Sequence, residues 1–360
     1  MMSLSAIRRF SKLPFVVPPR ELYEEKYKNT IMEYTSAVMV DRTRTFTDCG
    51  FANLIIEDEI PTVVVDPGNF CTIVDVTATN IINQATIHNK PIAVMYSGGL
   101  DSTCVTAALL KNGANITIVG SQASIDENPT FFSDVLLSNE SVKCEIGNPL
   151  MFLLNHRNDY TFVTGECGAH LMGTINWTKY GGRELDNIDA IEADHLAAGI
   201  FRNPEPFFNI PQETRTLLLK VLDKSPRSFK SNYDAQWWAI FALKWQFVTY
   251  RNQLWIGELC PSLINFFMND RFQMWALYND ASVKCPDYQW RNYKMPIRDY
   301  IYSYYPNRQA SYDLPKRASM ERTYKQLELR GRFVLNYPKQ IGFMRMSDKR
   351  MCHHYLTLVH

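Results

Sequence analysis

The chain has 360 residues, which is enough for one large domain or two smaller ones. Hydrophobic residues make up 46% and charged residues 21%, as in ordinary globular proteins, and the net charge of +1 favours no particular class of partner. No apolar run reaches the roughly 18 residues that a membrane-spanning helix needs, so we expect no membrane partner. Residues 1–29 lack the apolar core of a signal peptide, and we therefore expect a cytoplasmic protein.

The cysteines and the basic residues indicate which metal, redox and nucleic-acid sites to expect. The eight cysteines are scattered and none forms a C-x-x-C pair, which predicts free thiols rather than a zinc ribbon or a redox centre. Residues 286–350 hold 14 Lys and Arg against 6 Asp and Glu, and they are rich in tyrosine. This composition is typical either of a solvated helical face with a few functional cations or of a surface that binds nucleic acid or polyphosphate.

The N-terminal residues 1–79 predict a small β-containing unit. Three β-branched runs, separated by proline and glycine, are expected to be strands at 51–59, 61–66 and 71–78. Residues 80–89 predict a short helix that leads into the next part of the chain.

From residue 91 onward, predicted strands and helices alternate. This order is typical of an α/β fold, in which a parallel sheet carries helices on both faces, and we expect it to occupy residues 80–183. Ligands of such sheets bind at the carboxyl ends of the strands. The strands are expected at 92–96, 116–121, 142–146 and 160–165, and the helices at 102–112, 128–138 and 149–156.

The remaining residues, 184–360, predict a mainly helical C-terminal part. The longest expected helix, 233–253, is heavily loaded with aromatic residues, and a second helix or helix pair is expected at 263–279. An aromatic stripe of this kind is typical of a packed core rather than of a binding site.

The sequence Ser97–Thr103, which reads SGGLDST, joins a predicted strand to a predicted helix. Gly98 and Gly99 allow backbone conformations closed to other residues, and the following helix offers unpaired N–H groups, so the turn predicts an anion site. Neither of the common phosphate motifs, G-x-x-x-x-G-K-[ST] or G-x-G-x-x-G, is present. Because the carboxylate of Asp101 would repel a phosphate, a magnesium ion is expected between them.

This turn resembles the pyrophosphate-binding loop of the N-type ATP pyrophosphatases, a Rossmann-like family that includes asparagine synthetase, GMP synthetase, NAD synthetase and argininosuccinate synthetase. A second stretch, 162–173, is similar to the S-G-E-G-A-D-E-L-F-G-G segment of the asparagine synthetases. Glu166 falls on its glutamate, whereas Ala169 and His170 replace its Asp and second Glu.

Two later stretches resemble the same family. Residues 266–280 resemble its P-F-L-D-x-R-x-x-x-F segment, and residues 293–301 resemble its T-K-x-x-L-R-x-A element. The resemblance places Lys294 on the lysine that faces the phosphates and Arg298 on the arginine four residues later. It covers roughly residues 80–305 and implies that the C-terminal part completes the active site.

The resemblance implies roles for single residues. ATP and Mg²⁺ are the expected cofactors, with Asp101 as the metal ligand, Lys294 as a second cation and Glu166 as the base that activates the amine. Asp101, Lys294 and Glu166 are therefore the expected catalytic residues. The residues expected to bind the nucleotide are Ser97, Gly98, Gly99, Asp101, Ser102, Thr103, Val119, Gly120, Ser121, Gly165 and Arg298.

The implied function is that of an AMP- and pyrophosphate-forming ligase, which adenylates a small carboxylate and transfers it to ammonia or an amine. The first cysteine is Cys49, so we expect no glutaminase domain with an N-terminal cysteine nucleophile, and the ammonia would be free or come from a separate amidotransferase subunit. Two alternatives remain open at this point. One is an adenylating enzyme that modifies a nucleotide or nucleic-acid base, and the other is a non-catalytic relative that binds ATP or AMP.

Overall fold

The structure is a computed structural model, and it describes residues 42–45, 58–173, 219–230, 232–245, 263–288 and 292–314. The chain forms two compact units. The sheet unit contains the described residues of 63–172 and of 263–314. The tryptophan unit contains residues 42–45, 58–62, 173, 219–230 and 232–245. Both units combine parts of the chain that are distant in the sequence.

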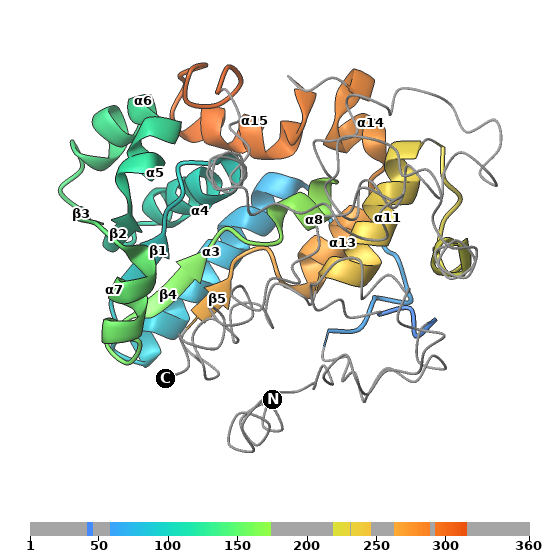
Figure 1. Ribbon diagram of the computed structural model, residues 1–360, viewed down its shortest axis with the longest axis horizontal. Coiled ribbons are helices and arrows are strands. Elements are labelled where there is room, and N and C mark those ends of the chain that lie inside the picture. Colours follow the sequence, from blue (N-terminus) through green and yellow to red (C-terminus); the bar gives the residue numbers. More distant parts are fainter. Residues whose placement is uncertain are drawn as a thin grey trace, which may run out of the picture. The chain divides into compact units, whose positions relative to one another are not determined.

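A five-stranded parallel sheet forms the centre of the sheet unit, in the order β3-β2-β1-β4-β5 (Figure 1). The α/β class predicted from the sequence is therefore correct. The side chains of β1, β2 and β4 are almost entirely buried, as expected for parallel strands covered on both faces. The strands are β1 (Ile92–Met95), β2 (Ile116–Gly120), β3 (Val142–Ile146), β4 (Thr161–Thr164) and β5 (Leu263–Asn265).

Helices connect the strands and cover them. Before β5 they are α3 (Phe70–Ile87), α4 (Leu100–Lys111), α5 (Gln122–Glu127), α6 (Pro129–Phe131), the π-helix η4 (Phe132–Leu136), α7 (Pro149–His156) and α8 (Gly168–Met172). After β5 they are α13 (Asp270–Tyr278), α14 (Ala281–Lys284), the 3₁₀ helix η6 (Pro286–Tyr288) and α15 (Met295–Tyr304). No helix among the described residues is both long enough and apolar enough to cross a membrane.

Helix α3 corrects one prediction. The run 71–78, expected to be a strand, lies inside this 18-residue helix, and the short helix expected at 80–89 is its second half. The side chain of Asn69 caps the helix by accepting a hydrogen bond from the Cys71 N–H, 2.7 Å away. The buried residues follow a helical spacing, because one face packs against α4, α13 and α15. Tertiary packing has overridden the low helix propensity of the β-branched residues.

Strand β5 corrects a second prediction. The segment 263–279 was expected to be helical throughout, but its first three residues pair with β4 in the register Phe162↔Leu263 to Thr164↔Asn265. The helix begins only at α13, which Asn269 caps through the Phe272 N–H, at 3.2 Å. Three residues are too few to show a strand period in the sequence.

The order of the strands creates a switch point between β1 and β4. The chain moves from β1 to β2 and β3, and then returns to place β4 on the other side of β1. With right-handed crossovers, this reversal puts α4 and α7 on opposite faces of the sheet. The loops that follow β1 and β4 therefore diverge at the carboxyl edge, and this is where open α/β sheets bind ligands.

The tryptophan unit is built around α11 (Asn232–Lys244). Trp237, Trp238 and Phe241 are at most 1% exposed, which confirms that the aromatic stripe predicted at 233–253 forms a core within the described part of that range. Trp238 Nε1 donates to the carbonyl of Val221 at 2.7 Å. The backbone N–H of Arg42 donates to Ala242 O at 3.1 Å, while its guanidinium donates to Phe241 O at 2.9 Å, so this segment is fastened to α11.

Candidate functional site

The glycine turn expected to bind a phosphate lies at the switch point, between β1 and α4. Gly98 has φ +76°, a conformation that glycine adopts without strain. A side chain at Gly98 would also overlap with the backbone oxygen of Ser124 in α5. Both features make glycine necessary at position 98.

Hydroxyl groups hold the turn in shape. Ser102 Oγ lies 3.0 Å from Ser97 Oγ and donates to the carbonyl of Gly99 at 3.0 Å, and Thr103 Oγ1 donates to the carbonyl of Gly98 at 3.4 Å. Gly99 is the N-cap residue of α4, and no side-chain hydrogen bond caps this helix. The first-turn N–H groups therefore keep their capacity to bind an anion, and the helix dipole adds a favourable field.

Asp101 and Lys294 form an ion pair across the site. Lys294 Nζ donates to Asp101 Oδ2, and the two side chains are 2% and 24% exposed. Lys294 caps α15 with φ +60°, a left-handed conformation that costs a residue other than glycine of order 1 kcal/mol. Its ammonium also lies 5.4 Å from the centre of the Tyr293 ring. Residues 193 positions apart in the chain are thus joined at the start of α4.

Two glycines after β4 allow the second loop to approach Asp101. A Cβ at Gly165 would come within 2.7 Å of the Asp101 carbonyl carbon and of the Ser102 nitrogen. A Cβ at Gly168 would overlap with the Asp101 carboxylate. The sequence singled out Gly165 but missed Gly168, since a lone glycine inside a partial motif gives no sign of what it packs against.

Glu166 lies in the turn between these glycines and is half-buried. Its N–H donates to Thr164 Oγ1 at 3.1 Å, and Thr164 Oγ1 donates to Asn265 Oδ1 at 3.1 Å, so β5 supports the turn. Cys167 follows with φ +71°, while His170 in α8 is buried. The segment that carries Glu166 therefore adjoins the glycine turn.

Arg298, expected to bind the nucleotide, bonds three backbone carbonyls. Its Nε donates to the carbonyl of Tyr293, and its Nη1 donates to those of Ser311 and Tyr312, all at 2.7 Å. Burial lowers the pKa of this guanidinium from its ordinary value. These bonds fix the backbone next to Lys294, and they direct the guanidinium to backbone carbonyls.

The end of β2, expected to receive adenine and ribose, is occupied by internal hydrogen bonds. The carbonyl of Val119 accepts from the Tyr96 N–H and that of Gly120 from the Gly147 N–H, both at 2.9 Å. Ser121 caps α5 through a reciprocal pair of bonds with Ser124. A base at this edge would therefore have to contact other atoms of these residues.

Asp101 provides the chemistry that a magnesium ion requires. Its Oδ1 is buried and has no hydrogen-bond partner among the described residues, while Oδ2 is held by Lys294. No group of three His, Cys, Asp or Glu side chains in the described ranges could hold a metal by itself. A site with one carboxylate still fits Mg²⁺, because this ion is usually held by one or two carboxylates together with substrate phosphates and water.

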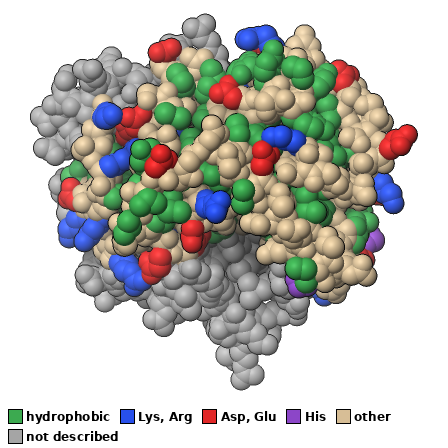
Figure 2. Space-filling view, turned by 180° about the vertical axis from the view of Figure 1, so that it is seen from behind, with side chains coloured by type: hydrophobic (Ala, Val, Ile, Leu, Met, Phe, Trp, Pro, Cys, Tyr) green, Lys and Arg blue, Asp and Glu red, His purple; other side chains and the backbone are tan. Residues whose placement is uncertain are grey.

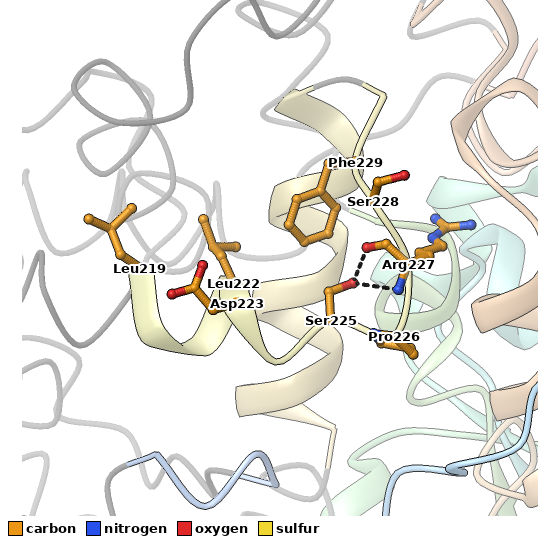
Figure 3. Close-up of a pocket in the computed structure, with 8 residues that line it drawn as sticks. All are labelled: Leu219, Leu222, Asp223, Ser225, Pro226, Arg227, Ser228 and Phe229. Carbon is orange, nitrogen blue, oxygen red and sulfur yellow. Dashed lines mark hydrogen bonds between the residues drawn. The ribbon is translucent and has the colours of Figure 1, made fainter.

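A cavity of about 630 Å³ lies in the tryptophan unit and contains none of the residues expected to be functional. Figure 3 shows Ser225 among the residues that line this cavity, with its hydroxyl bonded to the backbone N–H and carbonyl of Arg227. The guanidinium of Arg227 donates to Asp234 at 3.1 Å and lies 4.6 Å from the Trp237 ring centre. The residues that line the cavity are Leu219, Leu222, Asp223, Ser225, Pro226, Arg227, Ser228 and Phe229.

A gathering of basic side chains on the surface would favour the nucleic-acid alternative. On the one face that Figure 2 shows, acidic and basic side chains are interspersed. Of the basic range 286–350, the structure describes 286–288 and 292–314, and the rest lies outside the described residues.

In comparisons with known proteins, no family model and no curated protein matches this chain.

Proposed function

We propose that the protein is an AMP-forming ligase that adenylates a carboxylate and transfers the acyl group to ammonia or an amine. The observation that carries the proposal is the ion pair between Asp101 and Lys294 at the start of α4. It brings together, at the switch point of a parallel sheet, two segments that resemble the same family in the sequence. A glycine turn, an uncapped helix start and a buried cation are suited to a leaving pyrophosphate.

The first half-reaction needs charge neutralisation. A carboxylate oxygen attacks the α-phosphorus of ATP, the bond to the bridging oxygen of the β-phosphate breaks, and pyrophosphate leaves. The turn Ser97–Thr103 binds the leaving group through backbone N–H groups, and Lys294 neutralises part of its charge. When bound, Mg²⁺ would be held by Asp101 and would supply the remaining positive charge.

The second half-reaction needs a base. The nitrogen of ammonia or an amine attacks the acyl carbon, the bond to AMP breaks, and the proton of the nitrogen passes to a nearby acceptor. Glu166 is the proposed acceptor, because its turn packs against the backbone of Asp101 through Gly165.

The direct test is to incubate the purified chain with ATP, Mg²⁺ and a panel of small carboxylates, with and without ammonia, and to identify the nucleotide products. Formation of AMP and pyrophosphate that depends on one carboxylate is expected. Formation of ADP and orthophosphate would refute the proposal. Release of AMP only when a nucleotide or nucleic acid replaces the carboxylate would favour the alternative substrate class.

A further inference from the structure

Strand β3 forms one edge of the sheet, and no strand among the described residues pairs with its outer side (Figure 1). Its five residues, VKCEI, are half-buried or exposed, in contrast to the buried strands β1, β2 and β4. An open edge of this kind is a template for pairing with another strand. What it pairs with should follow from its hydrogen-bonding groups and its side chains.

The ladder with β2 fixes which backbone groups of β3 point outward. The Ile116 N–H donates to Ser141 O and the Gly147 N–H donates to Gly120 O, both at 2.9 Å. In a parallel pair, alternate residues face the partner, so the odd-numbered residues from 141 to 147 face β2. The N–H and C=O groups of Val142, Cys144 and Ile146 therefore point to the open side. Of these, the Val142 N–H is already bonded to Asn139 O at 2.9 Å.

These outward groups are self-complementary about Cys144. If a second copy of β3 runs antiparallel with Cys144 opposite its own copy, the two Cys144 residues exchange two backbone hydrogen bonds. The Ile146 N–H of each chain then donates to the Val142 carbonyl of the other. Four inter-chain hydrogen bonds result. The remaining outward N–H group, that of Val142, is already bonded to Asn139 O within its own chain.

The side chains are self-complementary in the same register. Lys143 and Glu145 are both exposed and lie on the same face of the strand. About a two-fold axis at Cys144, each Lys143 lies directly opposite Glu145 of the other chain, which gives two opposite-charge pairs. A shift of the register by two residues would lose this match.

Apolar side chains are also exposed in and around β3. Ile146 is 41% exposed, and two further exposed apolar side chains, Leu137 and Met151, come from the segments immediately before and after β3. Exposed apolar side chains next to an open strand are typical of a surface that becomes covered.

From these observations we propose that β3 is a homodimer interface, in which two copies pair antiparallel about Cys144 and join their sheets into one of ten strands. This proposal is independent of the proposed catalytic function. Continuous sheets of this width occur in α/β proteins. The occupant is a second copy, because the single register that pairs the outward backbone groups of two β3 strands also places each Lys143 opposite Glu145.

Charge reversal provides the main test, with sedimentation velocity over a concentration series reaching about 100 μM, where a complex with a Kd of about 10 μM is largely formed. Lys143→Glu places carboxylates opposite each other and Glu145→Lys places ammonium groups opposite each other, so each should weaken the dimer at least about tenfold. The double variant Lys143→Glu/Glu145→Lys should restore it. A monomeric wild-type chain, or a double variant as weak as the single ones, would overturn the proposal.

Two proline variants test the backbone register. Cys144→Pro removes an outward N–H and should abolish the dimer while leaving the ladder with β2 and the melting temperature nearly intact. Glu145→Pro removes an N–H that faces β2, so it should lower the melting temperature. A dimer that survives Cys144→Pro would show that this edge is not the interface.

Cross-linking with a short bis-maleimide provides a test of proximity in the wild-type chain. Paired Cys144 residues would have Cα atoms about 5.5 Å apart and Cβ atoms at a similar distance, which is long for a direct disulfide but within reach of the linker, so a covalent dimer should form. Cys144→Ser should prevent it, whereas Cys71→Ser, which removes another half-buried thiol of the sheet unit, should not. An unchanged yield of covalent dimer in Cys144→Ser would contradict the register.

Discussion

Gly168 packs directly against the carboxylate of Asp101, leaving no room for a Cβ atom. Alanine at this position should push the carboxylate away from Lys294. We expect Gly168→Ala to lower the free energy of unfolding by about 1–3 kcal/mol, as overpacking usually does, and to lower any ATP-dependent activity at least tenfold. Gly147→Ala is the matched control, since a Cβ there meets nothing within 4 Å. Equal effects of the two substitutions would show that the contact with Asp101 is unimportant.

The ion pair between Asp101 and Lys294 should stabilise the fold as well as the site. Asp101→Asn leaves the buried ammonium without the carboxylate that balances it, and we expect a loss of about 2–4 kcal/mol in denaturant unfolding. Lys294→Met should cost less, because it removes the buried charge itself. In a double-mutant cycle, Asp101→Asn/Lys294→Met should give a coupling energy of about 1–3 kcal/mol. Strictly additive effects would indicate that the two side chains do not interact in solution.

Exchange of labelled pyrophosphate into ATP should separate the roles of Glu166 and Lys294. Glu166→Gln removes only the base of the second half-reaction, so carboxylate-dependent exchange should persist while amide formation falls. Lys294→Ala removes a cation that stabilises the leaving pyrophosphate, so both the exchange of pyrophosphate and the formation of the amide should fall. Exchange that is lost in Glu166→Gln but kept in Lys294→Ala would reverse the assignment.

Asp75 should make the stability of the sheet unit depend on pH. Burial by itself raises the pKa of this carboxyl group, but hydrogen bonds from Lys111, Tyr300 and Asn112 outweigh it and hold the pKa below its ordinary value. The stabilisation is therefore complete above about pH 4 and is lost as the pH falls through the lower pKa of the folded state.

The substitution Asp75→Asn tests this directly. It should cost about 1 kcal/mol at pH 7, a modest value because Asp75 and Lys111 are 32% and 41% exposed. The difference in the free energy of unfolding from wild type should shrink as the pH falls below about 4. A difference that stays constant over this range would assign the effect to something other than the charge of Asp75.

Arg298 should act through the backbone that it fastens. Arg298→Lys retains the charge, but its single nitrogen cannot take the positions of both Nε and Nη1, so it should destabilise the protein by about 2–4 kcal/mol. Limited proteolysis within 305–314 should become faster, because two of those carbonyls belong to Ser311 and Tyr312. Unchanged proteolysis together with a raised KM for ATP would instead support direct contact with the nucleotide.

The alternating part of the fold could be predicted because local signals agree there. Between 91 and 165, each predicted strand ends within about two residues of its observed end, since apolar runs and turn residues coincide. Helix α3 and strand β5 could not be predicted in this way. Their structures depend on burial against elements far away in the sequence, which outweighs the propensity of their own residues.

The candidate site shows a similar division. The glycine turn is visible in the sequence because its residue types are restricted by backbone geometry. The sequence does not reveal the partner of Lys294 or the three carbonyls that hold Arg298. A motif gives the position of a residue along the chain but not the direction in which its side chain points. Lys294 and Arg298 lie one helical turn apart, yet one reaches Asp101 and the other reaches Ser311.

The 193-residue separation between Asp101 and Lys294 also sets the order of events during synthesis. At typical elongation rates of about 5–20 residues per second, the ribosome has made the glycine turn roughly 10–40 s before it adds Lys294. During that interval β2, β3, β4 and β5 are made one after another, but the ammonium that balances Asp101 is still missing. Any activity that depends on this pair begins only once the chain is made through α15, so a prematurely terminated polypeptide ending between β4 and α15 would be inactive.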